Sequence, residues 1–342
     1  MATGNDEILN RINYSRVYLM ICIILYHCFA FWTGGWFTKN PVNESVALCY
    51  LAKYLNTFHI YSFTFISGYV FYYTVFERVK ERIDKQSFFL KKARRLIVPY
   101  YFVVFIWIIP IETFFHNYTW TEIIRMYILG TSPNQLWFLL MLFWVQVLFF
   151  MFKDEICTSK YLSFIIAGFL YVTGYGLSYL LPKYNVFCVF NALLHCFTFL
   201  LGYKIRQYRL EGKISWKFLV PMHVILYFAV MHLDKNSSLA GMAMRVILQF
   251  FMFNVGAAGY FDFFNWLSVK VSPKLIRDIS PHTMCMFMFH QQIIYIFIVW
   301  LNGRTYPVVI AMIAFAGTFL SALAISRVLH ISRVTRFLIG DK

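Results

Sequence analysis

Residues 17–37, VYLMICIILYHCFAFWTGGWF, form an apolar stretch that is interrupted by a single histidine, His27. A helix of about 20 residues crosses the roughly 30 Å hydrocarbon layer of a bilayer, and this stretch has that length. A signal peptide would have a shorter apolar segment followed by small residues at a cleavage site, which this stretch lacks. We therefore predict that residues 17–37 are a retained membrane helix.

The rest of the chain repeats this pattern. Hydrophobic residues make up 60% of the 342 residues and charged residues only 13%, which excludes an ordinary soluble globular protein. The alternating strands that a membrane barrel requires are absent. We predict a single all-α domain over residues 1–342, a polytopic membrane bundle of about ten helices near 17–37, 57–76, 96–114, 135–152, 161–181, 186–203, 217–231, 239–267, 281–301 and 306–326. Residues 38–56 are expected to be a polar loop, and residues 122–130 a short outer or re-entrant piece.

The basic residues predict the orientation of this bundle. An even number of spans puts both termini on one side of the membrane. If that side is the cytoplasm, 24 of the 31 Lys and Arg residues lie in inner segments and 6 in outer segments, with Arg245 inside a span. This is a strong positive-inside asymmetry, so both termini are expected to be cytoplasmic. The net charge of +16 then needs no nucleic acid, because a basic inner face either meets anionic lipids or binds a phosphorylated cytosolic substrate.

Two histidines lie deep within predicted spans, where an ionisable side chain is costly and is functional by default. His27 follows Arg16 by eleven positions, so both side chains share one helix face and His27 lies about 16 Å deeper. His290 reaches nearly the same depth in its own span, so the two imidazoles can meet. A buried histidine is also commonly a hydrogen-bonded core residue, but the arginine on the same face favours function. A neutral imidazole can act as a general base or an acyl acceptor near pH 7.

Other polar residues within the spans have structural alternatives. His59 lies towards the outer end of the second span. Ser67, with the glycine after it, lies near the middle of that span, where small residues favour close packing of helices. Arg245 requires an acceptor or a water-filled cavity. His195 and Asn191 form an i, i+4 pair that fits hydrogen bonding between helices as well as catalysis.

Several common catalytic motifs are absent. The chain has no H-E-x-x-H and no Cys/His spacing typical of zinc, so no metal site is predicted. The seven cysteines lie mostly in apolar runs and are expected to be small core residues. The absence of a P-loop, G-x-G-x-x-G and G-x-S-x-G argues against an ATP-driven pump, a dinucleotide enzyme and a serine hydrolase.

Five segments in chain order together resemble membrane acyltransferase family 3, the integral-membrane O-acyltransferases of bacterial surface glycans. They are RVYLMICIILYH with Arg16 and His27, FHIYSFTFISGYVF with His59 and Ser67, FFLKKARRLIVPYY with Arg94 and Arg95, LWFLLMLF with Trp137, and ISPHTMCMFMFH ending at His290. The chain departs from the family pattern in two places. Arg94 and Arg95 are adjacent where many relatives have spaced arginines, and Pro281-His282 replaces a common Tyr-Gly.

The resemblance implies transfer of an acyl group, most often acetyl, from cytosolic acyl-CoA to a hydroxyl of a surface polysaccharide or lipid-linked glycan. The reaction would take place in a bacterial inner membrane. The residues implied are His27, His290 and His59 for catalysis, Arg16, Arg94 and Arg95 for the phosphates of acetyl-CoA, and Ser67 and Trp137 for substrate binding or structure. Arg245, a charged residue within a span, is expected to have a substrate-binding or structural role as well. No fused extracytoplasmic esterase-like domain is expected, and a homo-oligomer is compatible with the sequence.

A glycolipid transporter or flippase is the alternative from another functional class. Its buried His and Arg residues would serve as ligands or proton relays. Many transporters show paired halves and broken helices, and neither is evident in this sequence.

Overall fold

The computed structural model describes residues 4–34, 39–78, 84–213, 215–233, 238–268 and 273–341, and these residues are entirely helices and their connections. In these ranges, eight helices are long and apolar enough to cross a membrane. They are Ile8–Thr33, Lys85–Phe115, Asn134–Met151, Tyr161–Leu180, Val186–Gln207, Ala240–Leu267, Pro273–Leu301 and Pro307–Leu329. The other two predicted spans correspond to the shorter helices α3 (His59–Tyr72) and α12 (Trp216–His232). The prediction of a polytopic helical membrane bundle is confirmed.

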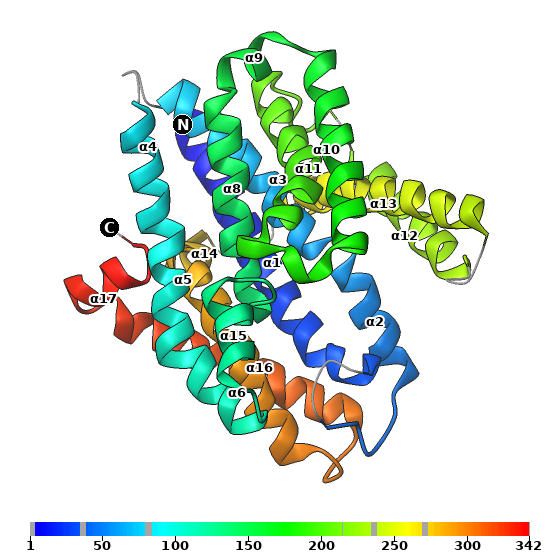
Figure 1. Ribbon diagram of the computed structural model, residues 1–342, viewed down its shortest axis with the longest axis vertical. Coiled ribbons are helices and arrows are strands. Elements are labelled where there is room, and N and C mark those ends of the chain that lie inside the picture. The colour runs from blue at the N-terminus through cyan, green and yellow to red at the C-terminus, as the bar shows by residue number, and fades with distance from the viewer. Residues whose placement is uncertain are drawn as a thin grey trace.

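Helix α1 (Gly4–Ala30) runs through the middle of the bundle (Figure 1). It contacts α3 and five other helices, which are α2 (Val46–Asn56), α13 (Leu239–Leu267), α14 (Pro273–Ile279), α15 (Thr283–Leu301) and α16 (Pro307–Leu329). Because neighbours surround it, Leu19, Ile23 and Ile24 of α1 are completely buried. The polar side chains of Ser15 and His27 on α1 are buried as well.

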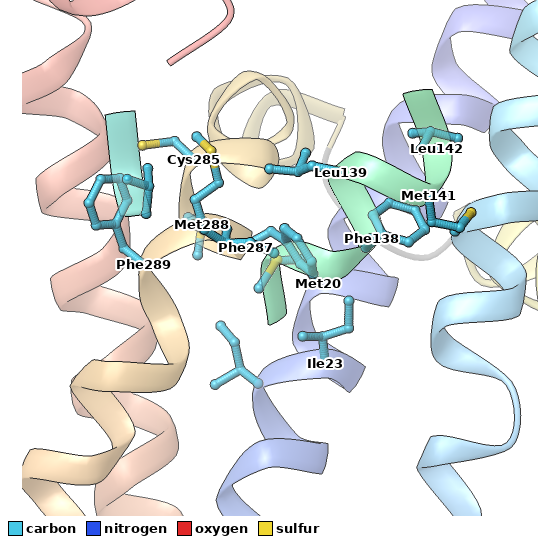
Figure 2. Packing of buried hydrophobic residues seen from close by; sticks show 14 of the residues in the cluster. Met20, Ile23, Phe138, Leu139, Met141, Leu142, Cys285, Phe287, Met288 and Phe289 are labelled. Atoms are coloured by element: carbon cyan, nitrogen blue, oxygen red, sulfur yellow. The ribbon is translucent and has the colours of Figure 1, made fainter. Parts of the chain in front are cut away.

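The core joins α1 and α15 to α8 (Trp137–Met151) (Figure 2). Met20 and Ile23 of α1 lie beside Phe138 of α8 and Phe287 of α15, and all belong to one cluster of buried side chains. The rings of Phe138 and Phe287 are 5.6 Å apart between centroids. This packing fixes the register of α15 against α1 one turn before His290.

Two glycines allow α3 to pack closely on α11 (Val189–Gln207). A Cβ atom at Gly68 would overlap the carbonyl oxygen of Phe199, and one at Gly202 would overlap that of Phe65. The packing interpretation of the Ser67-Gly68 pair is therefore confirmed for the glycine. Small residues at such crossings let helix backbones approach closely in a membrane.

The span Lys85–Phe115 accommodates two prolines through π-helical turns. It consists of α4 (Lys85–Lys92), a π-segment Ala93–Ile97, α5 (Val98–Val103), a second π-segment Val104–Ile108, and α6 (Ile109–Phe115). A proline cannot donate the i to i−4 hydrogen bond and clashes with the carbonyl at that position. Each π-segment ends shortly before a proline, Pro99 or Pro110, and widens the turn there.

Several helices begin or occur where hydropathy does not predict them. The first helix begins at Gly4, and the helix of the third predicted span begins at Lys85. The start at Lys85 is set by Asp84, whose side chain accepts hydrogen bonds from the backbone N–H groups of Gln86 and Ser87. The predicted loop 38–56 contains α2, which buries Leu48 and Ala52. The remaining helices are α7 (Trp120–Ile123), which continues as a π-segment Ile124–Ile128, α9 (Lys153–Thr158), α10 (Tyr161–Leu180), α14 (Pro273–Ile279) and α17 (Arg333–Leu338).

Candidate functional site

The structure brings His27 of α1 and His290 of α15 into direct contact. The Nε2 atom of His290 lies 3.1 Å from Nδ1 of His27, and the ring centroids are 4.7 Å apart. The expectation that the two imidazoles meet is confirmed. They come from helices that are 263 positions apart along the chain, and the core packing of α1 on α15 places them together.

The hydrogen bonds around this pair assign the ring protons. Nδ1 of His290 lies 2.7 Å from the carbonyl oxygen of Phe287 and donates to it, so Nε2 of His290 is an acceptor. Nδ1 of His27 faces two acceptors, which are Nε2 of His290 and, at 3.0 Å, the carbonyl oxygen of Ile23. Nδ1 of His27 therefore carries the proton, and Nε2 of His27 holds the basic lone pair.

His59 belongs to the same cluster through Tyr26. The Tyr26 ring lies 4.6 Å from that of His27 and 4.7 Å from that of His59, and Nδ1 of His59 donates to the carbonyl oxygen of Leu55 at 2.6 Å. His27 keeps 9% of its surface exposed, compared with 1% for His59 and none for His290. His27 is therefore the least buried histidine of this cluster. Tyr26 was missed in the sequence, although its position directly before His27 was a signal.

Two of the three predicted arginines, Arg16 and Arg95, lie close to each other, and Lys92 lies close to Arg95. The positive charges of Arg16 and Arg95 are close enough to repel each other, and Arg95 also repels Lys92. Arg94 stacks on Phe337 of α17, with its guanidinium carbon 4.5 Å from the ring centroid. Among the described residues, no salt bridge joins any of these arginines to a carboxylate. Clustered guanidinium groups without a carboxylate partner are suited to binding phosphates.

Ser67 and Arg245 are satisfied by local hydrogen bonds. Ser67 Oγ donates to the carbonyl oxygen of Phe63 in its own helix at 2.8 Å. Arg245 donates from Nη1 to the carbonyl oxygen of Leu233 at 3.1 Å, which supplies the acceptor that the sequence required. No hydrogen bond within the described ranges joins either side chain to the histidine cluster. Both contacts are sufficient for a structural role.

His195 and Asn191 have different partners. The Nδ1 atom of His195 lies 3.1 Å from the hydroxyl oxygen of Thr64, and this hydrogen bond links α11 to α3. Asn191 accepts a hydrogen bond from the amide of Asn185. The interpretation as hydrogen bonding between helices holds for His195. The ring of Trp137 lies 5.5 Å from that of His195, and Trp137 lines a cavity near the ends of α8 and α11.

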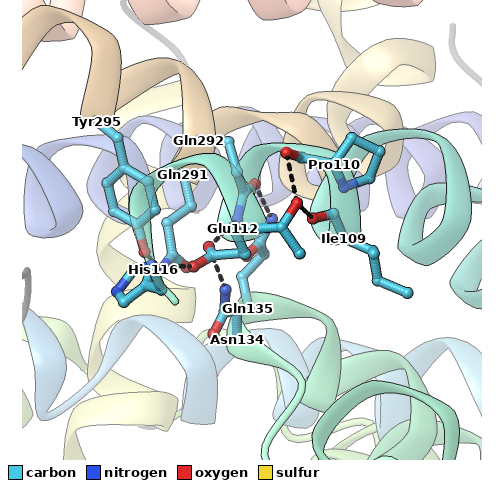
Figure 3. A network of polar contacts seen from close by, with 10 residues as sticks. Ile109, Pro110, Glu112, His116, Asn134, Gln135, Gln291, Gln292 and Tyr295 are labelled. Carbon is cyan, nitrogen blue, oxygen red and sulfur yellow. Dashed lines mark hydrogen bonds and ion pairs between the residues drawn. The ribbon is translucent and has the colours of Figure 1, made fainter. Parts of the chain in front are cut away.

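The sequence reasoning missed a buried polar network around Glu112 (Figure 3). Oε1 of Glu112 accepts from the amides of Asn134 at 2.5 Å and Gln292 at 3.2 Å. Gln135 bonds to Gln292 at 2.8 Å and donates to the carbonyl oxygen of Met288 at 2.9 Å. The network therefore reaches the turn of α15 that carries His290. A carboxylate in an apolar run and two glutamines directly after a buried histidine were the available signals.

Comparison with known proteins supports one assignment. No curated protein and no solved structure matches the chain. The family model described as an acyltransferase domain, acyltransferase 3, matches residues 9–327. That range holds Arg16, Arg94, Arg95 and all three clustered histidines. Since the match covers most of a chain whose helices form a polytopic membrane bundle, this protein belongs to the acyltransferase 3 family of membrane acyltransferases.

Proposed function

We propose that this protein transfers an acetyl group from cytosolic acetyl-CoA to a hydroxyl of a surface polysaccharide or lipid-linked glycan at the outer side of a bacterial inner membrane. The main observation in support of this proposal is the contact between His27 and His290 at 3.1 Å. His27 lies on the same helix as Arg16. Family membership supports an acyltransferase. The acetyl-CoA donor and the glycan acceptor are what the family resemblance implies, and the direction of transfer follows from the orientation that the basic residues predict.

The donor end of the site is the arginine cluster. Acetyl-CoA carries several phosphates, and Arg16, Arg94 and Arg95 offer guanidinium groups that can bind phosphate oxygens in pairs. His27 lies eleven positions after Arg16 along the helix, a rise of about 16 Å. This distance is comparable to the length of the extended pantetheine arm, so a coenzyme held at the arginines can present its thioester near His27. The excess of basic residues on this side favours entry from the cytosol.

His27 is the proposed general base. Its Nε2 removes the proton from the acceptor hydroxyl while the hydroxyl oxygen attacks the thioester carbonyl carbon. The carbon–sulfur bond breaks as the ester bond forms, and the imidazolium returns its proton to the departing thiolate. The products are the O-acetylated glycan and free coenzyme A. His290 accepts the hydrogen bond from Nδ1 of His27 and thereby stabilises the imidazolium, which makes it a positioning residue.

An acyl-histidine intermediate would use the same lone pair. Nε2 of His27 would then attack the thioester carbonyl carbon, and the carbon–sulfur bond would break to release the thiolate. The glycan hydroxyl oxygen would later attack the acetyl group on the ring, the bond from that group to Nε2 would break, and the hydroxyl proton would pass to the thiolate. His59, joined to His27 through Tyr26, is close enough to assist this second step. Trapping of radiolabel on the protein before the acceptor is added distinguishes this route from direct transfer.

The test uses purified protein, radiolabelled acetyl-CoA and de-O-acetylated surface polysaccharide from the source cell. We expect His27→Ala to lower the transfer rate by roughly 100- to 10,000-fold, the usual contribution of a general base. The control is His232→Ala, because His232 is an exposed histidine at the end of α12. Full transfer by His27→Ala would remove His27 from the chemistry. Movement of glycan across a vesicle membrane without acetyl incorporation would favour a transporter.

A further inference from the structure

A polar cavity of about 220 Å³ lies between the segment before α8 and the segment before α11. Its lining includes Thr131, Ser132, Asn134, Trp137, Asn185 and Asn191. In the orientation that the basic residues predict, both segments lie on the outer side. The cavity is therefore on the opposite side of the bundle from the arginine cluster. None of the clustered histidines lines it.

The backbone around this cavity is strained. Four described residues other than glycine have a positive φ. Two of them line this cavity, Asn134 at 46° and Cys188 at 54°, and a third, Phe187 at 51°, directly precedes Cys188. Side chains disfavour this left-handed region, and such strain concentrates at functional sites. The two segments are tied together here, since the backbone N–H of Phe187 donates to the carbonyl oxygen of Leu129 at 2.8 Å. The cavity is thus a built feature of the fold.

The lining is polar and uncharged. Three amides and two hydroxyls surround the indole of Trp137. Asn185 donates to Asn191 at 2.5 Å and accepts from the backbone N–H of Phe190 at 2.9 Å, which holds both amides in place. No described residue accepts a hydrogen bond from Nδ2 of Asn191, so this amide group can donate to a ligand. Amides both donate and accept, as the hydroxyls of a sugar do, and an indole face covers the apolar C–H face of a sugar ring.

The volume limits what can bind. Pockets that enclose a whole drug-sized ligand measure roughly 300–1,000 Å³. At about 220 Å³, this cavity has room for one sugar ring, with the rest of a glycan outside. A phosphorylated or carboxylated ligand would need a cation, and the lining has none. The matching ligand is a neutral monosaccharide unit.

A chain of hydrogen bonds runs from the cavity to the turn of α15 that carries His290. Asn134 lines the cavity and donates to Glu112, which also accepts from Gln292, and Gln292 bonds to Gln135 (Figure 3). Gln135 in turn donates to the carbonyl oxygen of Met288, two residues before His290. We infer that this cavity binds a neutral sugar ring of the acceptor glycan from the outer side. The inference rests on the proposed acetyl transfer and adds the acceptor site to it.

The first experiment measures acceptor kinetics with de-O-acetylated surface polysaccharide from the source cell as the probe. Asn191→Ala is expected to raise the KM for the polysaccharide about three- to tenfold, the effect of losing one hydrogen bond, without raising the KM for acetyl-CoA. Asn117→Ala is the matched control, because Asn117 is an exposed outer asparagine outside the cavity. It should leave both constants unchanged. An unchanged polysaccharide KM in Asn191→Ala would overturn the inference.

The second experiment blocks the cavity without removing a hydrogen bond. Ser132→Cys in intact cells should react with a membrane-impermeant maleimide, and the labelled protein should lose transfer to the polysaccharide. Asn117→Cys should be labelled and keep its activity. Absence of labelling at Ser132→Cys, or full transfer after labelling, would refute an outer acceptor site. Wild-type protein that transfers no acetyl group at all would instead refute the proposed function, so the two failures are distinguishable.

Discussion

Replacement of His290 tests how the two imidazoles share the chemistry. His290→Leu removes the acceptor that lies 3.1 Å from Nδ1 of His27, but the carbonyl oxygen of Ile23 remains as a second acceptor at 3.0 Å. His27 therefore keeps its proton on Nδ1 and its lone pair on Nε2. What is lost is one hydrogen bond to a ring that becomes cationic in the proposed mechanism. Such a bond contributes about 1.5–3 kcal/mol.

This free energy corresponds to a fall in kcat of about 10- to 150-fold for His290→Leu, which is smaller than the loss expected for His27→Ala. His290→Gln supplies an amide oxygen and should recover most of the rate. The assay is acetyl transfer from radiolabelled acetyl-CoA at saturating substrate, with thermal unfolding in detergent to confirm that each variant is folded. A loss as large as that of His27→Ala would show that His290 takes part directly in the reaction. An unchanged rate would show that the contact has no role in it.

Two further predictions concern the helix crossing and the donor site. Gly202→Ala should lower the melting temperature in detergent, because its Cβ would overlap the carbonyl oxygen of Phe65 and push α3 from α11. Gly176 has open space around it, so Gly176→Ala should instead stabilise the folded protein by up to about 1 kcal/mol through helix propensity. Equal melting temperatures for the two variants would contradict the close crossing. Arg95→Gln should raise the KM for acetyl-CoA several-fold, with a larger effect at low ionic strength, whereas Arg304→Gln in an outer segment should not. A KM for acetyl-CoA that does not respond to Arg95→Gln would exclude Arg95 from phosphate binding.

Much of the fold could be predicted from hydropathy, because each span is a local property of about 20 consecutive residues. The ends of helices were predicted less well. Helix α1 begins 13 residues before the predicted span, and α2 lies in a predicted loop. Hydropathy reports where a helix enters lipid, whereas caps such as Asp84 and burial against neighbours decide how far the helix continues in water.

The residues of the candidate site were predicted individually, because a histidine or arginine in a predicted membrane helix is conspicuous in the sequence. Their arrangement was only partly predictable. Helix periodicity placed Arg16 and His27 on one face, and depth placed His290 level with His27. Glu112 was overlooked because its partners, Asn134 and Gln292, lie 22 and 180 positions away.

The amino-acid sequence by itself determined that this chain is a helical membrane protein, which residues are costly to bury, and how those on one helix are spaced. These are consequences of local composition and of the helical repeat. Only the tertiary structure decided that His27 touches His290, that a buried carboxylate connects α6 to α15, and that two loops enclose a polar cavity. Such contacts depend on which helix faces pack together, and that choice is made by side chains distant in the sequence, such as Met20, Phe138 and Phe287.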